Sequence, residues 1–317
     1  MFRFTFMLSL SLASMLALTG CAASGSKPSE LLSRSQRIVF LGDSITYAGS
    51  YVAYFDAWLT TQDLDRPPVV INVGLPSETV SGLSEEGHAG GRFPRPDLAE
   101  RLTRVLDVTE PDLVLACYGI NCGIYQPFGE ERFARYRQGI ERLRQEVRGR
   151  GAELVLITPP FFDDQRANKP FSYNAVLDRY SEWLLAQRDE GWPVIDLHGA
   201  MTEEVARRRL TDPQFTFQRD AVHPGPEGHW FMAAHLIHWF GDDRAASASS
   251  PEAMLESCGR DAEMLDLISQ RATLRRDAYL TAAGHQRPGI RAGLPLPEAR
   301  QKAAALTKQI DAGVSKE

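Results

Sequence analysis

Short apolar runs alternate with longer segments of helical periodicity along most of the chain. The runs are rich in Val, Ile and Leu and contain few polar residues, which is typical of strands covered on both faces. They are Ile38–Leu41, Val69–Val73, Leu113–Cys117, Leu154–Thr158 and Val194–Leu197. The helical pattern falls on Ser50–Thr61, Asp97–Val108, Glu130–Arg148, Tyr173–Arg188 and Glu227–Phe240. This alternation predicts a parallel sheet with helices on both faces.

Three polar or small residues follow directly after predicted strands. Ser44, Gly74 and Asn121 come after the first, second and third runs. The carboxyl ends of parallel strands meet at one edge of the sheet, and ligands bind at that edge. We therefore expect these three residues to lie together at a ligand site.

A small, polar stretch, Ala245–Pro251, separates this region from the C-terminal part of the chain. Beyond it, Glu252–Leu280 and roughly Pro297–Ile310 have helical patterns, with the glycine-containing loop Gly284–Gly289 between them. We expect residues 245–317 to form a helical extension and not an independent domain. The loop either folds back over the site or lies elsewhere, and nothing in the sequence decides between the two.

The N-terminus has the pattern of a targeting segment. Arg3 precedes an apolar stretch, Phe4–Leu18, that is short for a membrane span. The stretch ends in Leu18-Thr19-Gly20-Cys21, which resembles a bacterial lipobox. The resemblance implies a signal peptide over residues 1–21, lipidation of Cys21 and a tether over residues 22–36. Ala22 after the cysteine implies an outer-membrane lipoprotein of the bacterial envelope, facing the periplasm or the exterior. A plain signal peptide or a short membrane anchor is the alternative.

Composition narrows the function classes. The 317 residues are 43% hydrophobic and 24% charged, and the net charge is −6. A mildly acidic chain without a Lys/Arg cluster argues against nucleic acid as a partner. No Cys/His spacing resembles a zinc site. Besides Cys21 there are three cysteines, Cys117, Cys122 and Cys258, and the sequence does not determine whether any of them are paired.

The candidate chemistry combines Ser44 with a segment far downstream, Asp220-Ala221-Val222-His223. Nucleophilic catalysis by serine needs a hydroxyl, a base to remove its proton and a carboxylate to orient the base. Ser44, His223 and Asp220 supply these groups. A serine at a strand-to-helix turn also lies where backbone N–H groups stabilise negative charge. The alternative is that both segments are ordinary turns or caps.

An acyl-transfer intermediate also needs hydrogen-bond donors at its oxyanion. The Gly74 N–H, the Asn121 side-chain amide and the Ser44 N–H are the candidates. Asn121 as a loop-stabilising amide and Gly74 as a turn glycine are the structural alternatives.

Four segments in order resemble the SGNH/GDSL hydrolases: Gly42-Asp43-Ser44, Gly74, Gly119-Ile120-Asn121 and Asp220-Ala221-Val222-His223. The resemblance covers roughly residues 37–240 and implies a hydrolase domain over residues 37–244. It implies a three-layer α/β/α sandwich of the flavodoxin-like type with about five parallel strands, and ester hydrolysis without a cofactor or metal. By the same resemblance Ser44 is the nucleophile, Asp220 and His223 complete the triad, and Gly74 and Asn121 complete the oxyanion hole.

Two positions depart from the family pattern. Cys122 replaces the Asp that usually follows the third-block Asn, and we expect it to be a small packing residue. The second block, Asn72–Thr79, lacks the second glycine that is common in the family. Gly74 is therefore a weaker assignment than Ser44 or His223.

The resemblance implies that the substrate is an ester. An envelope location and the carbohydrate esterases of the family favour deacetylation of a polysaccharide, and lipid or short-chain ester hydrolysis is the alternative. Arg92, Tyr118 and Tyr125 are candidates for substrate contacts. A non-catalytic envelope binding protein on the same fold is the alternative from another class.

Overall fold

The computed structural model describes residues 27–62, 64 and 66–312, and its centre is a five-stranded parallel sheet. The strand order is β2-β1-β3-β4-β5, and every neighbouring pair is parallel. The strands are β1 (Arg37–Gly42), β2 (Val69–Asn72), β3 (Leu113–Cys117), β4 (Glu153–Ile157) and β5 (Val194–Ile195). This order is that of flavodoxin-like doubly wound sheets. The predicted fold class is therefore confirmed.

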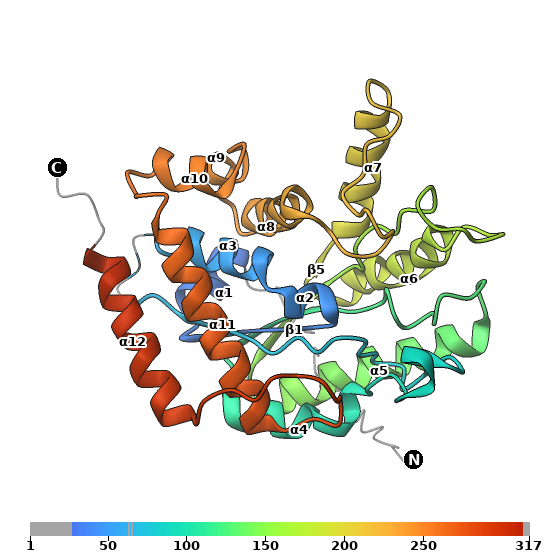
Figure 1. Ribbon diagram of the computed structural model, residues 1–317, viewed down its shortest axis with the longest axis horizontal. Coiled ribbons are helices and arrows are strands. Elements are labelled where there is room, and N and C mark those ends of the chain that lie inside the picture. The colour runs from blue at the N-terminus through green and yellow to red at the C-terminus, as the bar shows by residue number, and fades with distance from the viewer. Residues whose placement is uncertain (1–26, 63, 65, 313–317) are drawn as a thin grey trace, which may run out of the picture.

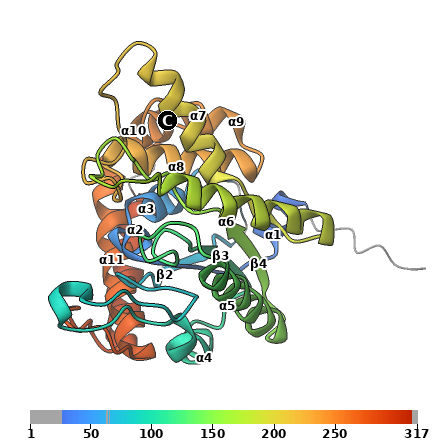
Figure 2. The ribbon, with the colours of Figure 1, turned by 90° about the vertical axis from the view of Figure 1, so that its right-hand side faces the viewer.

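Helices cover both faces of the sheet. Helices α3 and α8 lie on one face and α4 and α5 on the other (Figures 1 and 2). Helix α6 packs on α5, where Tyr180 and Tyr136 lie with ring centroids 4.5 Å apart. The helices of this domain are α1 (Pro28–Ser33), α2 (Ser44–Ala48), α3 (Ser50–Leu59), α4 (Leu98–Thr109), α5 (Glu130–Gly149), α6 (Asn174–Ala186), α7 (Leu197–Arg209) and α8 (Pro226–Trp239), with 3₁₀ turns at His88–Gly91 and Gln187–Glu190.

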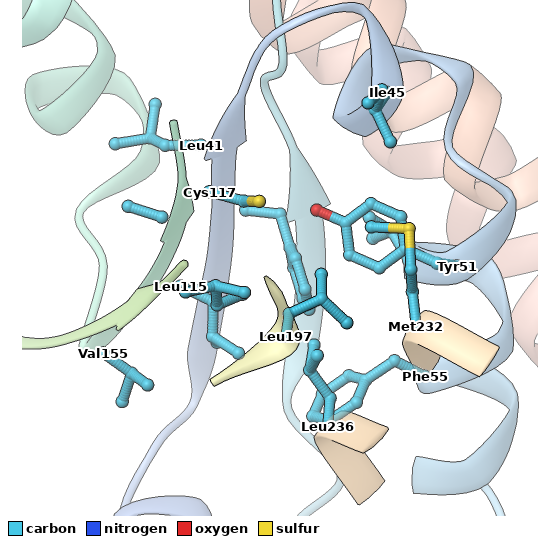
Figure 3. Close-up of a cluster of buried hydrophobic side chains, with 14 of the residues drawn as sticks. Leu41, Ile45, Tyr51, Phe55, Leu115, Cys117, Val155, Leu197, Met232 and Leu236 are labelled. Carbon is cyan, nitrogen blue, oxygen red and sulfur yellow. The ribbon is translucent and has the colours of Figure 1, made fainter. Parts of the chain in front are cut away.

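The core between α3, α8 and the sheet is made of large apolar side chains. Figure 3 shows Tyr51 and Phe55 of α3 beside Met232 and Leu236 of α8. All four side chains are buried, and the Phe55 ring meets Phe40 of β1 at a centroid distance of 5.4 Å. Burial of such side chains stabilises the fold by roughly 1.5–3 kcal/mol each. This packing fixes the end of β1, where Ser44 follows.

The fifth strand is shorter than the sequence pattern predicts. The run Val194–Leu197 was expected to be a strand throughout, but β5 ends at Ile195. Asp196 caps the next helix, because its carboxylate accepts a hydrogen bond of 2.9 Å from the Gly199 N–H. Leu197 is therefore the first residue of α7, a helix that the periodicity did not reveal.

Residues 28–36 do not form the second half of a tether. Helix α1 begins with a proline and buries Leu31 and Leu32 against the core. The physical reason for the correction is this pair of apolar side chains on one short helical turn. Cys21 and the rest of the proposed signal peptide and tether up to residue 26 lie outside the described residues.

The C-terminal part is helical, as expected, but it contains a break. The predicted helix Glu252–Leu280 is divided into α10 (Pro251–Ser257) and α11 (Met264–Ala283), preceded by α9 (Asp243–Ala246) and followed by α12 (Leu296–Ala312). The break follows from Gly259, whose φ of 68° is the left-handed conformation that ends helices. No helix in the described part of the chain is both long and apolar enough to cross a membrane.

Helix α11 packs directly on the hydrolase domain. It contacts α3, α4 and β2, and it runs along the β2 side of the sheet (Figure 2). The loop that follows it also reaches the domain: Arg287 Nε donates to the Pro76 carbonyl (3.3 Å), and the guanidinium lies 5.1 Å from the Phe93 ring centre. The extension thus packs against the turn in the second block (Asn72–Thr79), which we call the second-block turn.

Candidate active site

Ser44 stands at the carboxyl end of β1, at the first residue of α2. Asp43 caps this helix by accepting a hydrogen bond from the Ile45 N–H (3.0 Å). Gly42 has to be glycine here, because a Cβ would lie 2.1 Å from Thr46 Oγ1 and 3.0 Å from the Cys117 carbonyl oxygen. The tight turn presents the Ser44 side chain at the sheet edge, where it is half-buried.

The structure brings Ser44, His223 and Asp220 together in one hydrogen-bonded chain. Ser44 Oγ lies 2.8 Å from His223 Nε2, and His223 Nδ1 lies 2.7 Å from Asp220 Oδ2. A proton on Nδ1 that is donated to the carboxylate leaves Nε2 free to accept the serine proton. The geometry is that of a general base held ready next to a hydroxyl.

The loop that carries the base is folded around Asp220. Its Oδ1 accepts from the Val222 N–H (3.0 Å) and the His223 N–H (2.7 Å). Ala221 has a φ of 72°, which is strained for a residue with a Cβ. Partial burial acts to raise the pKa of Asp220, but these hydrogen bonds and the nearby histidine outweigh it and hold the pKa below the usual value. Asp220 is therefore suited to remain ionised and to orient His223.

Residues after β4 hold this loop in place. The Asp163 N–H donates to the Ala221 carbonyl (3.0 Å), and Gln218 Nε2 donates to the Phe161 carbonyl (2.8 Å). The buried Asp163 carboxylate accepts from Arg209 (2.7 Å) and Thr216 (2.5 Å). These contacts join residues far apart in sequence, which is why sequence reasoning did not find them.

The residues predicted to form the oxyanion hole come from two loops besides the Ser44 turn. Asn121 is buried, and its Nδ2 donates to the Glu78 carbonyl (3.3 Å), while its Oδ1 accepts from the Tyr125 hydroxyl (3.0 Å). The Asn121 side-chain amide has two N–H groups, and Glu78 takes one of them, so the other remains available to a ligand. The structure thus fixes the orientation of Asn121.

Gly74 lies where the sequence placed it, but its N–H has a partner. The N–H donates to Asn72 Oδ1 (2.9 Å), and Asn72 Nδ2 donates to the Thr46 carbonyl (2.6 Å). A Cβ on Gly74 would lie 2.5 Å from the Tyr47 nitrogen, so glycine is needed for the close approach of the segment after β2 to α2. Its part in stabilising an oxyanion stays a prediction.

The backbone N–H of Ser77, a residue that the sequence analysis did not single out, is a further candidate for a hydrogen-bond donor to an oxyanion. Its φ is 70°, a conformation that glycine adopts most readily, in the block that lacks the family's second glycine. Among the residues that the structure describes, no group accepts a hydrogen bond from the Ser77 N–H. The missing glycine was the sequence signal that could have pointed here.

The three predicted substrate contacts have different surroundings. Arg92 is exposed, and its Nε donates to the Ala89 carbonyl (2.8 Å). Tyr125 is half-buried and stacks on Tyr173 at a centroid distance of 4.9 Å. Tyr118 was wrongly predicted to contact substrate, because its side chain is 1% exposed and points into the protein, with its hydroxyl 2.6 Å from Glu78.

The described cysteines are all free thiols. Cys117 and Cys122 are buried, and burial raises the pKa of Cys122 to about 12, so its thiol is not reactive at neutral pH. Cys122 is a packing residue, as expected. In the described part of the chain, no group of three or more His, Cys, Asp or Glu side chains is placed to hold a metal ion.

The family is decided by a match over residues 40–231 to the GDSL-like lipase/acylhydrolase family. The chain belongs to this family. Its members are acylhydrolases and esterases, so the protein is an ester hydrolase, and the matched region contains all four of the segments in the sequence resemblance. No curated protein matches the chain.

Solved structures of several enzymes share the fold of this chain. An acetylxylan esterase from Geobacillus stearothermophilus superposes with a TM-score of 0.50 at 23% identity, over 65% of this chain and 94% of that chain. An alpha/beta hydrolase enzyme from the metagenome of Lake Arreo, Spain, superposes at 0.51 and 24% identity, over 65% and 95%. A gut microbial diltiazem-metabolizing enzyme superposes at 0.51 and 21% identity, over 68% of this chain and 48% of that chain, so this chain spans about half of that protein. At these identities the likeness shows the fold alone.

Proposed function

We propose that this protein is a serine esterase that removes acyl groups, above all acetyl groups, from a carbohydrate or another envelope or extracellular ester. The observation that carries the proposal is the hydrogen-bonded chain from Ser44 through His223 to Asp220 at the ligand-binding edge of the sheet. A binding module has no need of these three groups in this order.

The reaction has two steps. Ser44 Oγ attacks the ester carbonyl carbon while His223 Nε2 takes its proton, and the tetrahedral intermediate collapses as the alcohol leaves with that proton. Water then attacks the acyl-Ser44 carbonyl, His223 again accepts and returns a proton, and the carboxylic acid leaves. Asp220 stabilises the imidazolium in both steps without taking its proton.

The oxyanion in both steps needs donors aimed at one point. The Ser44 N–H and the Asn121 amide are the first candidates, with Gly74 and Ser77 on the second-block turn beside them. Removal of one such donor typically lowers kcat by about 10²–10³-fold. Asn121 is the donor whose removal tests this side of the site.

A carbohydrate substrate is supported by the openness of the triad. The side chains of His223 and Asp220 are 50% and 58% exposed, so a large polar molecule can approach without being enclosed. Arg92 is exposed and offers a charge of the kind that binds polar groups of sugars, and the half-buried Tyr125 lies beside Asn121. An acetylxylan esterase from Geobacillus stearothermophilus has the same fold. Hydrolysis of short-chain or lipid esters is the alternative.

We place the enzyme in the bacterial envelope, anchored through Cys21, on the basis of the lipobox-like sequence. We expect the full chain to partition into the detergent phase of a phase-separating detergent after expression in a Gram-negative bacterium. Cys21→Ser should abolish processing to the lipidated mature form. An unchanged mature form in this variant would contradict the anchor and favour a plain signal peptide.

Replacement of the nucleophile is the test of the reaction. Ser44→Ala should lower kcat at least about 10³-fold on acetylated xylo-oligosaccharides and on p-nitrophenyl esters of increasing chain length. The variant should unfold at the same urea concentration as the wild type. Preference for acetylated sugars supports the substrate class, and preference for long acyl chains supports the lipase alternative. No turnover of any ester by folded wild type favours the binding protein.

A further inference from the structure

A buried group of three side chains lies directly behind the oxyanion side of the site. Glu78, Arg101 and Tyr118 are 0%, 1% and 1% exposed. Arg101 Nε and Nη2 donate to the two Glu78 carboxylate oxygens at 2.6 and 2.7 Å, and the Tyr118 hydroxyl donates to Oε2 at 2.6 Å. A two-pronged guanidinium–carboxylate pair fixes orientation as well as distance. We call these three residues the buried triplet.

The buried triplet connects the segments that carry the oxyanion candidates. Arg101 Nη2 also donates to the Val73 carbonyl (2.8 Å), next to Gly74. Glu78 follows Ser77, and its own carbonyl accepts from Asn121 Nδ2 (3.3 Å). Tyr118 starts the loop in which Asn121 stands three residues later. The Arg101 guanidinium on α4 thus holds Val73 and Glu78 of the second block, and Glu78 in turn joins that block to the Asn121 loop.

Stability alone is a poor explanation for charges at this position. The desolvation of two charges offsets much of their attraction, so a buried ion pair is often replaced by apolar residues of similar volume without loss of stability. A fixed geometry is what such a pair supplies beyond an apolar contact. Here that geometry includes the Glu78 carbonyl, which orients the Asn121 amide.

We infer that Arg101, together with Glu78 and Tyr118, is a positioning residue for ester hydrolysis: the buried triplet sets the Asn121 amide at the oxyanion. The inference rests on the proposed role of Asn121. It assigns a part in the reaction to α4, a helix that bears none of the triad residues. The triplet touches no substrate and acts only through the turn and loop it joins.

The main test replaces both charges at once. Glu78→Leu with Arg101→Met removes the ion pair and keeps the volume, so the urea midpoint should change little while kcat falls about 10–100-fold and KM stays within about twofold, as expected for lost transition-state stabilisation. The matched control is Asp56→Leu with Arg271→Met, which removes another buried ion pair, 3.0 Å long, between α3 and α11. Its kcat should be that of the wild type.

Coupling to Asn121 distinguishes positioning from a structural role. In an Asn121→Ala background the paired replacement at Glu78 and Arg101 should lower kcat less than twofold further, because residues that act through one group are not additive. A full additional loss, or an unchanged kcat in the wild-type background, would overturn the inference. If Asn121→Ala itself leaves kcat unchanged, the proposed oxyanion role fails first and the inference falls with it.

A milder variant keeps the test valid if the paired replacement does not fold. Tyr118→Phe removes one hydrogen bond to Glu78 and preserves the ring, so kcat should fall about 3–10-fold, again only where Asn121 is present. Tyr180→Phe, on another buried ring, is its control and should leave kcat unchanged. Equal kcat values for the two tyrosine variants would contradict the inference.

Discussion

At the residue scale, Asp43 shows how the turn at Ser44 affects stability. Its carboxyl is buried behind the nucleophile, and burial raises its pKa from 3.8 to about 6. Between these two values the folded protein binds a proton that the unfolded chain has lost. The contribution of Asp43 to the free energy of unfolding is therefore fully present below about pH 4 and is lost as the pH rises through about 6.

Asp43→Asn should remove this dependence. Its free energy of unfolding, measured with urea at pH 4 and pH 7, should gain about 2 kcal/mol relative to the wild type between the two pH values. The charged neighbours His223, Glu78 and Arg95 are the same residues in both proteins, so the two proteins differ only in the Asp43 charge and its interactions with them. Parallel stability curves for the two proteins would show that Asp43 does not titrate in this range.

Residues of the site differ in how far the sequence could reveal them. Asp220 and His223 are three residues apart, so their contact is local and a turn suffices to make it. Arg101 and Glu78 are separated by a long loop that contains a 3₁₀ turn, so only the folded topology shows their pairing. Tyr118 was misplaced because the sequence puts it just after a strand but does not give the side of the backbone on which its ring lies.

At the element scale, helix α5 closely approaches Val80, the residue that follows the second block. A Cβ on Gly139 would lie 1.9 Å from the Val80 carbonyl oxygen, so the helix backbone and this segment are in contact. Gly149, at the end of the same helix, has no atom within 4 Å of an added Cβ. Alanine substitutions at these two glycines of one helix can therefore be compared directly, one in a crowded position and one in open space.

Gly139→Ala should lower the free energy of unfolding by at least about 1–3 kcal/mol through overpacking, while Gly149→Ala should raise it by about 0.5 kcal/mol. Urea denaturation of the two variants measures both. Similar stabilities would mean that α5 is not packed against Val80. Since Val80 lies two residues after Glu78, we expect Gly139→Ala to reduce ester turnover as well.

The elements that sequence reasoning missed have weak local signals. Helix α7 has a glycine in its first turn and little separation of apolar and polar faces, so its only clear mark was the capping Asp196. The interruption between α10 and α11 depended on a single left-handed glycine. The strands were found more completely, because burial on both faces gives each of them a continuous apolar run.

At the scale of the whole molecule, the C-terminal extension is an integral part of the fold. Arg271 of α11 pairs with Asp56 of α3, and both side chains are buried. Nearby, Arg276 Nη1 donates to the Tyr47 carbonyl (2.8 Å), in the helix that begins with Ser44. The extension thus supports the active-site helix α2 from outside the matched family region.

Asp56→Ala should destabilise the protein by about 3–5 kcal/mol, because it leaves the buried Arg271 without its partner. Glu110→Ala, which breaks an exposed pair with Arg37, should cost less than about 1 kcal/mol and serves as the control. Thermal and urea unfolding measure both. Equal small effects would indicate that the extension is only loosely attached.

The central claim is that Ser44 is an activated nucleophile, and labelling with a fluorophosphonate probe tests it most directly. Folded wild type should be labelled at Ser44, as located by peptide mass spectrometry, while Ser44→Ala should not be labelled and His223→Ala should react at least about 10²-fold more slowly. Absence of labelling in folded wild type, or equal labelling of Ser44→Ala, would contradict the account.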